Sequence, residues 1–278
     1  MISNKITKYF VIGLLMISGC QFHPPIKNEI RIKGSDTMLL LTGRLAATFM
    51  KNNPQYIVIN EGGGSLVGIK ALIKGEVDLC AASRTLKADE IKSLAENFNV
   101  VGISHLIAKD ALSIFVNQKN QMRDLSLDQI RKIFSGEITD WSEVGGEPGK
   151  INVIIRSPNS GTHYYFYEHV LEEKDYASSA IIRNTTEDVL NEIRTDSLAI
   201  GYGGIGYAND VPHIQINGID PKIENVRNNS YPIIRYLYFY TLNTVDGITK
   251  KFFDWVISPE GQQVVEESGY IPLWDTNR

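Results

Sequence analysis

Cysteine is scarce in this chain, whose 278 residues include only Cys20 and Cys80. Two cysteines cannot form the disulfide framework of a small secreted scaffold or a cysteine-based zinc site. Histidine is also rare, and His163 and His169 are spaced so that they would lie on different faces of a helix. A hydrolase would need a nucleophile with a base, or a metal cluster, and neither is visible. We therefore expect no enzyme activity and no cofactor.

An excess of charge and a long hydrophobic run are missing as well. Lys and Arg number 28 against 32 Asp and Glu, which gives a net charge of -4. This mild acidity offers no broad counter-charge to a nucleic acid, although a small anion site needs only a few aimed donors. Hydrophobic residues make up 43% and charged residues 22%, which excludes a disordered chain. At about 150 residues for each domain, the length predicts two domains.

The first nineteen residues have the pattern of an export signal. Two lysines precede the apolar run 10–17, which has the length of a signal-peptide core and not of a bilayer span. Ser and Gly then stand directly before Cys20, which is similar to a bacterial lipobox; an ordinary signal peptide is the alternative. We predict a signal peptide over 1–19, lipidation of Cys20 with palmitate, and a tether over 20–28. The protein would then be exported and anchored at the outer face of the cytoplasmic membrane, on the periplasmic side or cell surface.

Beyond the tether, apolar strand-like runs alternate with segments of helical spacing. The predicted strands are 30–33, 56–60, 77–82, 112–117, 151–156, 198–202 and 231–242, and the predicted helices are 38–52, 67–74, 87–96, 127–134, 163–171, 248–256 and 259–268. Repeated strand–loop–helix units predict parallel sheets with helices on their faces. The stretch 231–242 carries Arg235 and suits a strand or a crossover between domains. Cys80 lies in an apolar run and is predicted to be a small buried residue.

Polar loops follow several of these strands, and each of them precedes a predicted helix. They are Gly34-Ser35-Asp36-Thr37, Gly63-Gly64-Ser65, Ser83-Arg84, and Arg156 with Ser160-Gly161-Thr162. Open parallel sheets bind ligands beyond the carboxyl ends of their strands, and helix N-termini offer free N–H groups to anions. The two arginines add planar forks that match an oxyanion. Any single loop could hold only helix caps or surface charges, but their shared position predicts a site for a small tetrahedral oxyanion.

Longer stretches carry a resemblance that runs from about Ile30 to Pro272. They are Gly-Ser-Asp-Thr-Met at 34–38, Gly-Gly-Gly-Ser at 62–65, Gly-Ile-Lys-Ala-Leu at 68–72, Val77-Asp78, Ser83-Arg84, 133–141, Arg156 with 160–162 and Phe166, 199–202, and 258–262. In these stretches the chain resembles the substrate-binding proteins of bacterial phosphate ABC transporters. The resemblance implies the two-lobed, type II periplasmic-binding-protein α/β fold. Each lobe is a mainly parallel sheet flanked by helices, with lobe I at 29–108 plus 236–278 and lobe II at 109–235.

The resemblance also implies a function and a set of site residues. A monomer would bind inorganic phosphate in the interlobe cleft, without chemistry on it, and deliver it to an ABC permease of two membrane-spanning subunits and an ATPase. Carried over residue by residue, the phosphate contacts fall at Ser35, Asp36, Thr37, Ser65, Ser83, Arg84, Arg156, Ser160, Gly161 and Thr162. The chain departs from the usual family pattern after Ser65, where Leu66-Val67 replaces Gly-Thr, and some members have an acid at the position of Ser83.

Several alternatives remain open beside phosphate transport. The ligand could be another tetrahedral oxyanion such as sulfate or molybdate, or the fold could serve a non-transport signalling role. The string Gly201–Gly206 fits a dinucleotide fingerprint but is not followed by a helical pattern, so no nucleotide is expected. Asp36 is the single acid within the four loops. It either accepts the proton that phosphate keeps and sulfate lacks, or only caps a helix.

Overall fold

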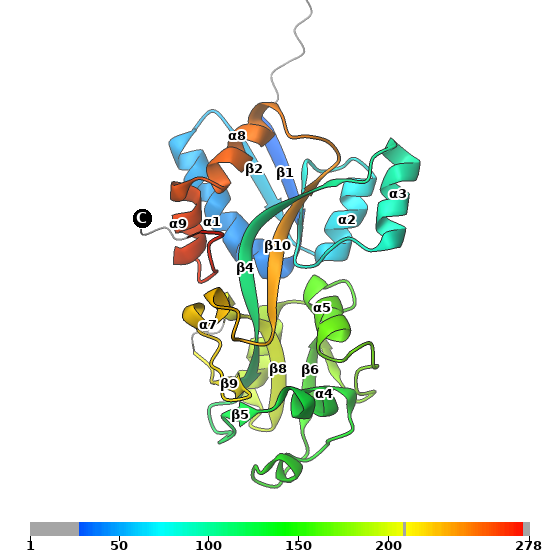
Figure 1. The fold of residues 1–278 in the computed structure, drawn as a ribbon, viewed down its shortest axis with the longest axis vertical. Coiled ribbons are helices and arrows are strands. Elements are labelled where there is room, and N and C mark those ends of the chain that lie inside the picture. Colours follow the sequence, from blue (N-terminus) through cyan, green and yellow to red (C-terminus); the bar gives the residue numbers. More distant parts are fainter. Residues whose placement is uncertain (1–27, 208–209, 275–278) are drawn as a thin grey trace, which may run out of the picture.

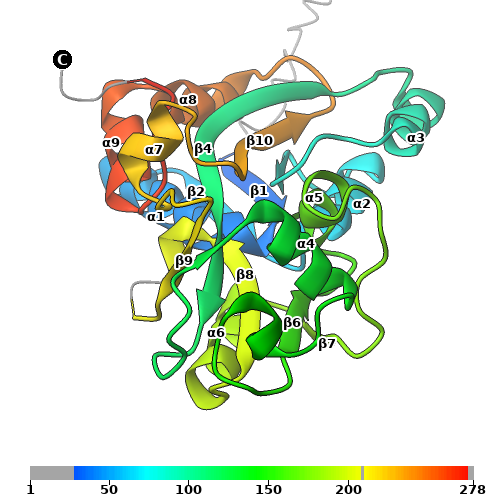
Figure 2. The ribbon, with the colours of Figure 1, turned by 60° about the horizontal axis from the view of Figure 1, so that its bottom comes forward.

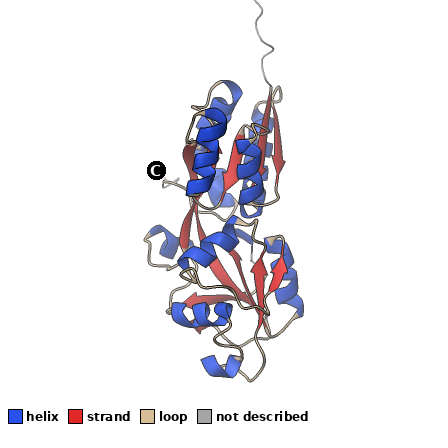
Figure 3. Ribbon diagram, turned by 90° about the vertical axis from the view of Figure 1, so that its right-hand side faces the viewer, coloured by secondary structure: helices blue, strands red, loops and turns tan. Residues whose placement is uncertain are grey.

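The computed structural model describes residues 28–207 and 210–274, so the predicted signal peptide, the lipidation site Cys20 and most of the tether lie outside the described residues. Figure 1 shows an upper and a lower lobe, and two long strands, β4 (Ile103–Val116) and β10 (Ile234–Thr241), run from one lobe into the other. In the side view of Figure 3, helices flank the strands in both lobes. The predicted two-lobed α/β architecture is therefore confirmed.

The upper lobe is built on β1 (Glu29–Gly34), which pairs in parallel with β2 (Ile57–Glu61) and β3 (Leu79–Ala82). Its helices are α1 (Asp36–Asn52), α2 (Ser65–Ile73), α3 (Ala88–Phe98), α8 (Gly247–Val256) and α9 (Pro259–Glu267). One buried cluster joins α1, α8 and α9 to the sheet, and a second joins α2 and α3 to it. Leu79 and Ala81 belong to the first cluster and Cys80 to the second, because successive strand residues point to opposite faces.

The lower lobe carries β8 (Ala199–Gly204), which pairs in parallel with β6 (Asn152–Arg156), while β7 (Ile181–Arg183) pairs in parallel with β6. Its other elements are β5 (Asp124–Leu125), β9 (His213–Ile216), α4 (Leu127–Ser135), α5 (Gly161–His169), α6 (Thr186–Thr195), α7 (Ile223–Arg227), and the 3-10 turns η1 (Trp141–Val144) and η2 (Ile205–Tyr207). Figure 2 shows α4 and α6 with strands β6 to β8 in this lobe.

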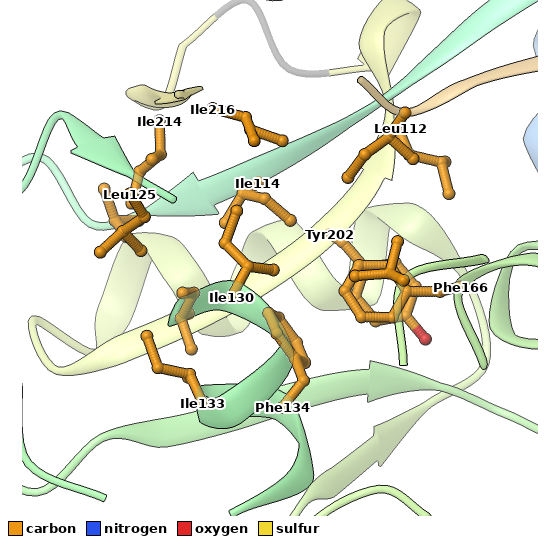
Figure 4. Packing of buried hydrophobic residues seen from close by; sticks show 14 of the residues in the cluster. Leu112, Ile114, Leu125, Ile130, Ile133, Phe134, Phe166, Tyr202, Ile214 and Ile216 are labelled. Carbon is orange, nitrogen blue, oxygen red and sulfur yellow. The ribbon is translucent and has the colours of Figure 1, made fainter. Parts of the chain in front are cut away.

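An aromatic stack in the core of the lower lobe includes a ring from α5. Tyr202 of β8 stacks on Phe166 of α5 with ring centroids 4.1 Å apart, and Phe134 meets Phe166 edge-on at 4.8 Å. Figure 4 shows these rings beside aliphatic side chains from β4 and α4. The stack ties α5 to the sheet, so the helix start that follows β6 is held in place by buried apolar contacts.

The strands β4 and β10 connect the lobes as an antiparallel pair inside one continuous sheet. The strand order is β2-β1-β3-β10-β4-β8-β6-β7 among the described residues, so this pair stands at the centre. Arg235 lies opposite Asp110 and Leu237 opposite Ala108, and the register shifts between Leu237 and Tyr238. The predicted lobe boundaries, after 108 and after 235, fall within this paired stretch; as boundaries they stay a prediction.

The predicted strands and helices are confirmed, with shifts at their ends. The largest differences are β4, which begins at Ile103 and not at 112, and the elements that were not predicted: α6, α7, β5, β7 and β9. The first half of β4 was missed because Ser, His, Lys and Asp interrupt its apolar residues. A signal for α6 was present, since Thr185 and Asp188 form a capping box at its start.

The helix α2 lies so close to β1 that a side chain would not fit between them. A Cβ on Gly68 would lie 2.4 Å from the Lys33 carbonyl oxygen and 2.6 Å from the Gly34 Cα, both backbone atoms. In contrast, a Cβ on Gly43 of α1 would meet only the end of the Asn60 side chain, at 3.5 Å. Gly68 therefore sets the separation of α2 from the sheet, whereas Gly43 does not constrain its helix.

We expect Gly68→Ala to lower the free energy of unfolding by about 1–3 kcal/mol, because the added methyl must push α2 away from β1. The matched variant Gly43→Ala should raise it by about 0.5–1 kcal/mol, because alanine restricts the unfolded chain without a clash in the helix. Urea unfolding followed by circular dichroism measures both. Equal effects of the two substitutions would contradict the close approach of α2 to β1.

Candidate functional site

The polar loops after the strands of both lobes meet at one buried point. Thr37 of α1 and Thr162 of α5 approach to 2.7 Å between their hydroxyl oxygens, which joins the upper lobe to the lower. A Cβ on Gly161 would lie 2.3 Å from the Ser65 Oγ and 2.6 Å from the Ser83 Oγ. The start of α5 is thus in direct contact with the upper-lobe serines, and glycine is required there because no side chain fits.

The three upper-lobe serines of this site form a small hydroxyl network. Ser35 Oγ donates to Ser83 Oγ at 2.9 Å, and Ser65 Oγ accepts from the Ser83 backbone N–H at 3.2 Å. Ser65 and Ser83 are fully buried, and Ser35 is 3% exposed. Buried hydroxyls need hydrogen-bond partners, and here they bond mainly to one another. Such a cluster can turn its protons toward an anion without breaking any secondary structure.

Helices α1, α2 and α5 all begin at this point. Ser160 Oγ caps α5 by accepting from the Thr162 and His163 backbone N–H groups, which leaves the Ser160 hydroxyl proton free to donate elsewhere. The N-cap residues Ser35 of α1 and Gly64 of α2 make no side-chain cap. First-turn N–H groups of a helix have no partner inside the helix, and together with the helix dipole they favour an anion.

Arg156, at the end of β6, brings a positive charge into this buried site. Its side chain is fully buried, and its guanidinium donates to the Asn184 carbonyl oxygen at 2.7 Å and to Thr186 Oγ1 at 2.8 Å. A third contact, at 3.3 Å, reaches the carboxylate of Asp36 in the upper lobe. Burial lowers the pKa of Arg156 from its ordinary value, and the negative charge of Asp36 opposes that shift.

Asp36 lies in the first turn of α1, but its carboxylate does not cap that helix. Oδ1 accepts from the Gly63 backbone N–H at 2.8 Å, and Oδ2 faces Arg156. The Tyr207 hydroxyl donates to the backbone carbonyl oxygen of Asp36 at 2.6 Å, which adds a second link to the lower lobe. The structure thus directs the carboxylate toward the site, where a ligand group could donate to it.

Arg84 is the predicted site residue whose side chain turns elsewhere. Its Nη1 and Nη2 donate to the two carboxylate oxygens of Glu90 at 2.8 and 2.7 Å, and both side chains are buried. Burial alone would lower the pKa of Arg84, but the hydrogen bonds and charge of Glu90 outweigh it and raise the pKa. The other predicted residues come together, whereas the guanidinium fork of Arg84 is occupied by an acid six positions later in the chain.

The structure adds residues that the sequence analysis did not assign to the site. Arg235 of β10 donates to Thr162 Oγ1 at 2.9 Å and pairs with Asp110 of β4. A charged residue inside an apolar, aromatic strand was the available signal for Arg235. No comparable sequence signal marked Asp110, because it lies in the part of β4 that was not predicted.

Cations of the upper lobe also cover an aromatic ring of the lower lobe beside the site. The Lys87 ammonium lies 3.5 Å from the centroid of the Tyr164 ring, and the Arg84 guanidinium carbon lies 5.3 Å from it. Both distances suit cation–π attraction. Because Tyr164 belongs to α5 and Lys87 directly precedes α3, this contact bridges the lobes and stabilises their approach.

Two further features bear on the chemistry of the described part of the chain. Within residues 28–207 and 210–274, no group of three His, Cys, Asp or Glu side chains is placed to hold a metal ion. In the same ranges, no helix combines the length and the apolar character that a membrane crossing requires.

Comparison with known proteins gives concordant results. The family model described as the PBP superfamily domain matches residues 21–260. The phosphate-binding protein PstS of Bacillus subtilis is 31% identical over 250 residues, which cover 89% of this chain and 81% of that protein. A crystal structure from Clostridium perfringens, with bound phosphate and described as a candidate substrate-binding protein of a phosphate ABC transporter, superposes with a TM-score of 0.82 and 28% identity. It covers 89% of this chain and all of that one.

A second solved structure, an ABC-type phosphate transport receptor from Vibrio cholerae, superposes with a TM-score of 0.73 and 30% identity, covering 87% of this chain and 99% of that one. The likeness to these relatives extends over both lobes, because the aligned parts span nearly all described residues. The printed descriptions of these relatives are those of substrate-binding proteins. The chain belongs to the PBP superfamily and, within it, to the substrate-binding proteins of phosphate ABC transporters.

Proposed function

We propose that this protein binds inorganic phosphate between its lobes and delivers it to an ABC-type membrane permease. The observation that carries the proposal is the meeting of both lobes at one buried point lined by hydroxyls, helix starts and Arg156. Such a point suits a small anion with many hydrogen-bonding oxygens, because buried donors that point at the anion form short hydrogen bonds shielded from water. The phosphate named for the relatives is the anion that fits this description.

In the proposal, the phosphate oxygens accept from both lobes at once. The upper lobe contributes Ser35, Thr37, Ser65 and Ser83, and the lower lobe contributes Arg156, Ser160, Gly161 and Thr162. Arg84 joins the site through its place beside Ser83; with its fork held by Glu90, it supplies positive charge and fixes the loop. Closure of the lobes and capture of the ligand are then one event, since neither lobe alone holds the full set of donors.

Asp36 is proposed to distinguish phosphate from fully deprotonated oxyanions. Its carboxylate accepts from the Gly63 backbone N–H and lies beside Arg156, so it faces the site. A proton on phosphate can be donated to it, whereas sulfate would place bare negative charge against a carboxylate. The choice between phosphate and sulfate would then depend on one acceptor group, and not on the number of donors.

The proposed setting of this function is the outer face of the cytoplasmic membrane. The signal over 1–19 and the lipidated Cys20 would tether the two lobes there through residues 20–28. The partners would be the two membrane-spanning permease subunits and the ATPase on the cytoplasmic side, and the protein would act as a monomer. Treatment of the expressing cells with an inhibitor of lipoprotein signal cleavage, followed by mass measurement, reads out the lipid on Cys20 directly.

Calorimetric titration of residues 21–278, freed of bound anion, should show tight binding of phosphate and none of sulfate. The reason is the acceptor at Asp36 among otherwise anion-favouring donors. Molybdate is a second comparison anion, because it has the same tetrahedral geometry but a different size, so it tests whether the site selects by size. Tight binding of sulfate without binding of phosphate would show that sulfate is the ligand. If none of the three anions binds, the result would support a non-transport role.

Substitution Asp36→Asn should weaken phosphate binding by about 2–5 kcal/mol, because it leaves Arg156 and the ligand proton without their charged partner. Sulfate binding should improve, so the ratio of the two affinities falls. Asp89→Asn is the matched control, since Asp89 also lies in the first turn of a helix but is exposed. An unchanged phosphate-to-sulfate ratio in Asp36→Asn would contradict the discriminating role.

Substitution Tyr164→Leu should speed phosphate release about two- to fivefold, because it removes a cation–π contact of about 0.5–1 kcal/mol from the closed form. Tyr164→Phe keeps the ring under Lys87 and should release phosphate at the rate of the unaltered protein. Stopped-flow measurement with a phosphate trap gives the rates. Equal rates in Tyr164→Leu and Tyr164→Phe would show that the contact does not hold the lobes together.

A further inference from the structure

A second buried ion pair joins the two strands that connect the lobes. Arg235 of β10 and Asp110 of β4 stand opposite each other in the sheet register. Nε and Nη2 of Arg235 both donate to Oδ2 of Asp110, at 2.9 and 2.7 Å. The two side chains are 1% and 0% exposed, so this charge pair is withdrawn from water between the two strands that connect the lobes.

The third nitrogen of the Arg235 guanidinium does not bond to Asp110 and instead reaches the binding site. Nη1 donates to Thr162 Oγ1 at 2.9 Å, and that oxygen lies 2.7 Å from Thr37 Oγ1. A guanidinium can only donate, so the Thr162 oxygen must accept from it. The single proton of the Thr162 hydroxyl is then free to point toward Thr37 or toward a bound anion.

Close packing keeps this chain of contacts continuous from the connecting strands to both lobes. A Cβ on Gly204 would lie 3.0 Å from Asp110 Oδ2 and 3.0 Å from Thr37 Cγ2, so the bare backbone of β8 is what fits between them. Thr37 and Thr162 are 1% and 0% exposed. Burial is the main cause that lowers the pKa of Arg156, and the positive charge of Arg235 contributes in the same direction.

We propose that Arg235, oriented by Asp110, is a positioning residue for the bound anion. It fixes the Thr162 hydroxyl as a donor to the ligand and brings a second buried guanidinium to the site. Through Arg235, the relative position of strands β4 and β10 also affects how the Thr162 hydroxyl is held at the binding site. This inference rests on the proposed phosphate function and adds to it residues of β4 and β10 outside the four polar loops.

The test is a double-mutant cycle on phosphate affinity with Arg235→Lys and Thr162→Val. Lysine keeps the charge beside Asp110, but it lacks the planar fork whose separate nitrogens donate to Asp110 and to Thr162. We expect each single variant to weaken phosphate binding about 10- to 100-fold, the effect of losing one hydrogen bond to a charged group. The double variant should bind about as weakly as either single one, because both changes remove the same aimed hydroxyl.

Two controls separate positioning from structural damage. Arg131→Gln removes another arginine–acid contact of the lower lobe, to Glu172, and should leave affinity unchanged. The paired variant Arg235→Gln with Asp110→Asn removes both charges together, which avoids an unpaired buried carboxylate. It should unfold cooperatively in urea and still bind phosphate weakly. If only this paired variant fails to fold, the cycle with Arg235→Lys still decides the question.

The outcomes distinguish this inference from the proposed function. Failure of the unaltered protein to bind phosphate would overturn the proposed function itself. Tight binding by the unaltered protein, with effects of Arg235→Lys and Thr162→Val that multiply in the double variant, would show independent roles and overturn the positioning role. Unchanged affinity in Arg235→Lys would overturn it as well.

Discussion

The cost of keeping charge out of water governs the arrangement of this protein's site. Arg156 is fully buried, and a buried guanidinium is stable only when its donors are matched by acceptors. Asn184 and Thr186 supply acceptors from the lower lobe, and Asp36 supplies a carboxylate from the upper lobe. The charge of one lobe is therefore compensated in part by the other, which couples the approach of the lobes to electrostatics.

Close backbone approach is the second requirement, and glycine meets it at the places where the lobes touch. Gly161 lets the start of α5 lie against Ser65 and Ser83, and Gly64 lets the start of α2 lie against the Asn159 carbonyl, 2.5 Å from where a Cβ would be. These contacts bring helix N-termini of both lobes to one point. Since helix starts and hydroxyls are neutral donors, they can surround an anion without adding charge that must itself be compensated.

The polar loops could be found in the sequence because their signal is local. Ser35, Ser65 and Ser160 stand where an apolar strand pattern gives way to a helical one, and the carboxyl ends of parallel strands meet at one edge. Arg235 and Asp110 do not stand at such a transition from strand to helix. Their pairing depends on the register of β4 against β10, strands separated by most of the lower lobe. Arg84 shows the reverse case. Its place in a polar loop was evident from the sequence, but the ion pair between its guanidinium and Glu90 was not.

Local patterns of polarity and turn residues are enough to predict the alternation of strands and helices, the loops that hold the hydroxyls, and the residue types suited to an oxyanion. The pairing of the charges, in contrast, depends on how the chain folds in space. Asp36 turns away from its own helix toward Arg156, and Arg235 reaches Thr162 across the connecting strands. Such choices depend on distances between segments far apart in the chain, and a few ångströms of separation decide whether two buried charges stabilise or destabilise the fold.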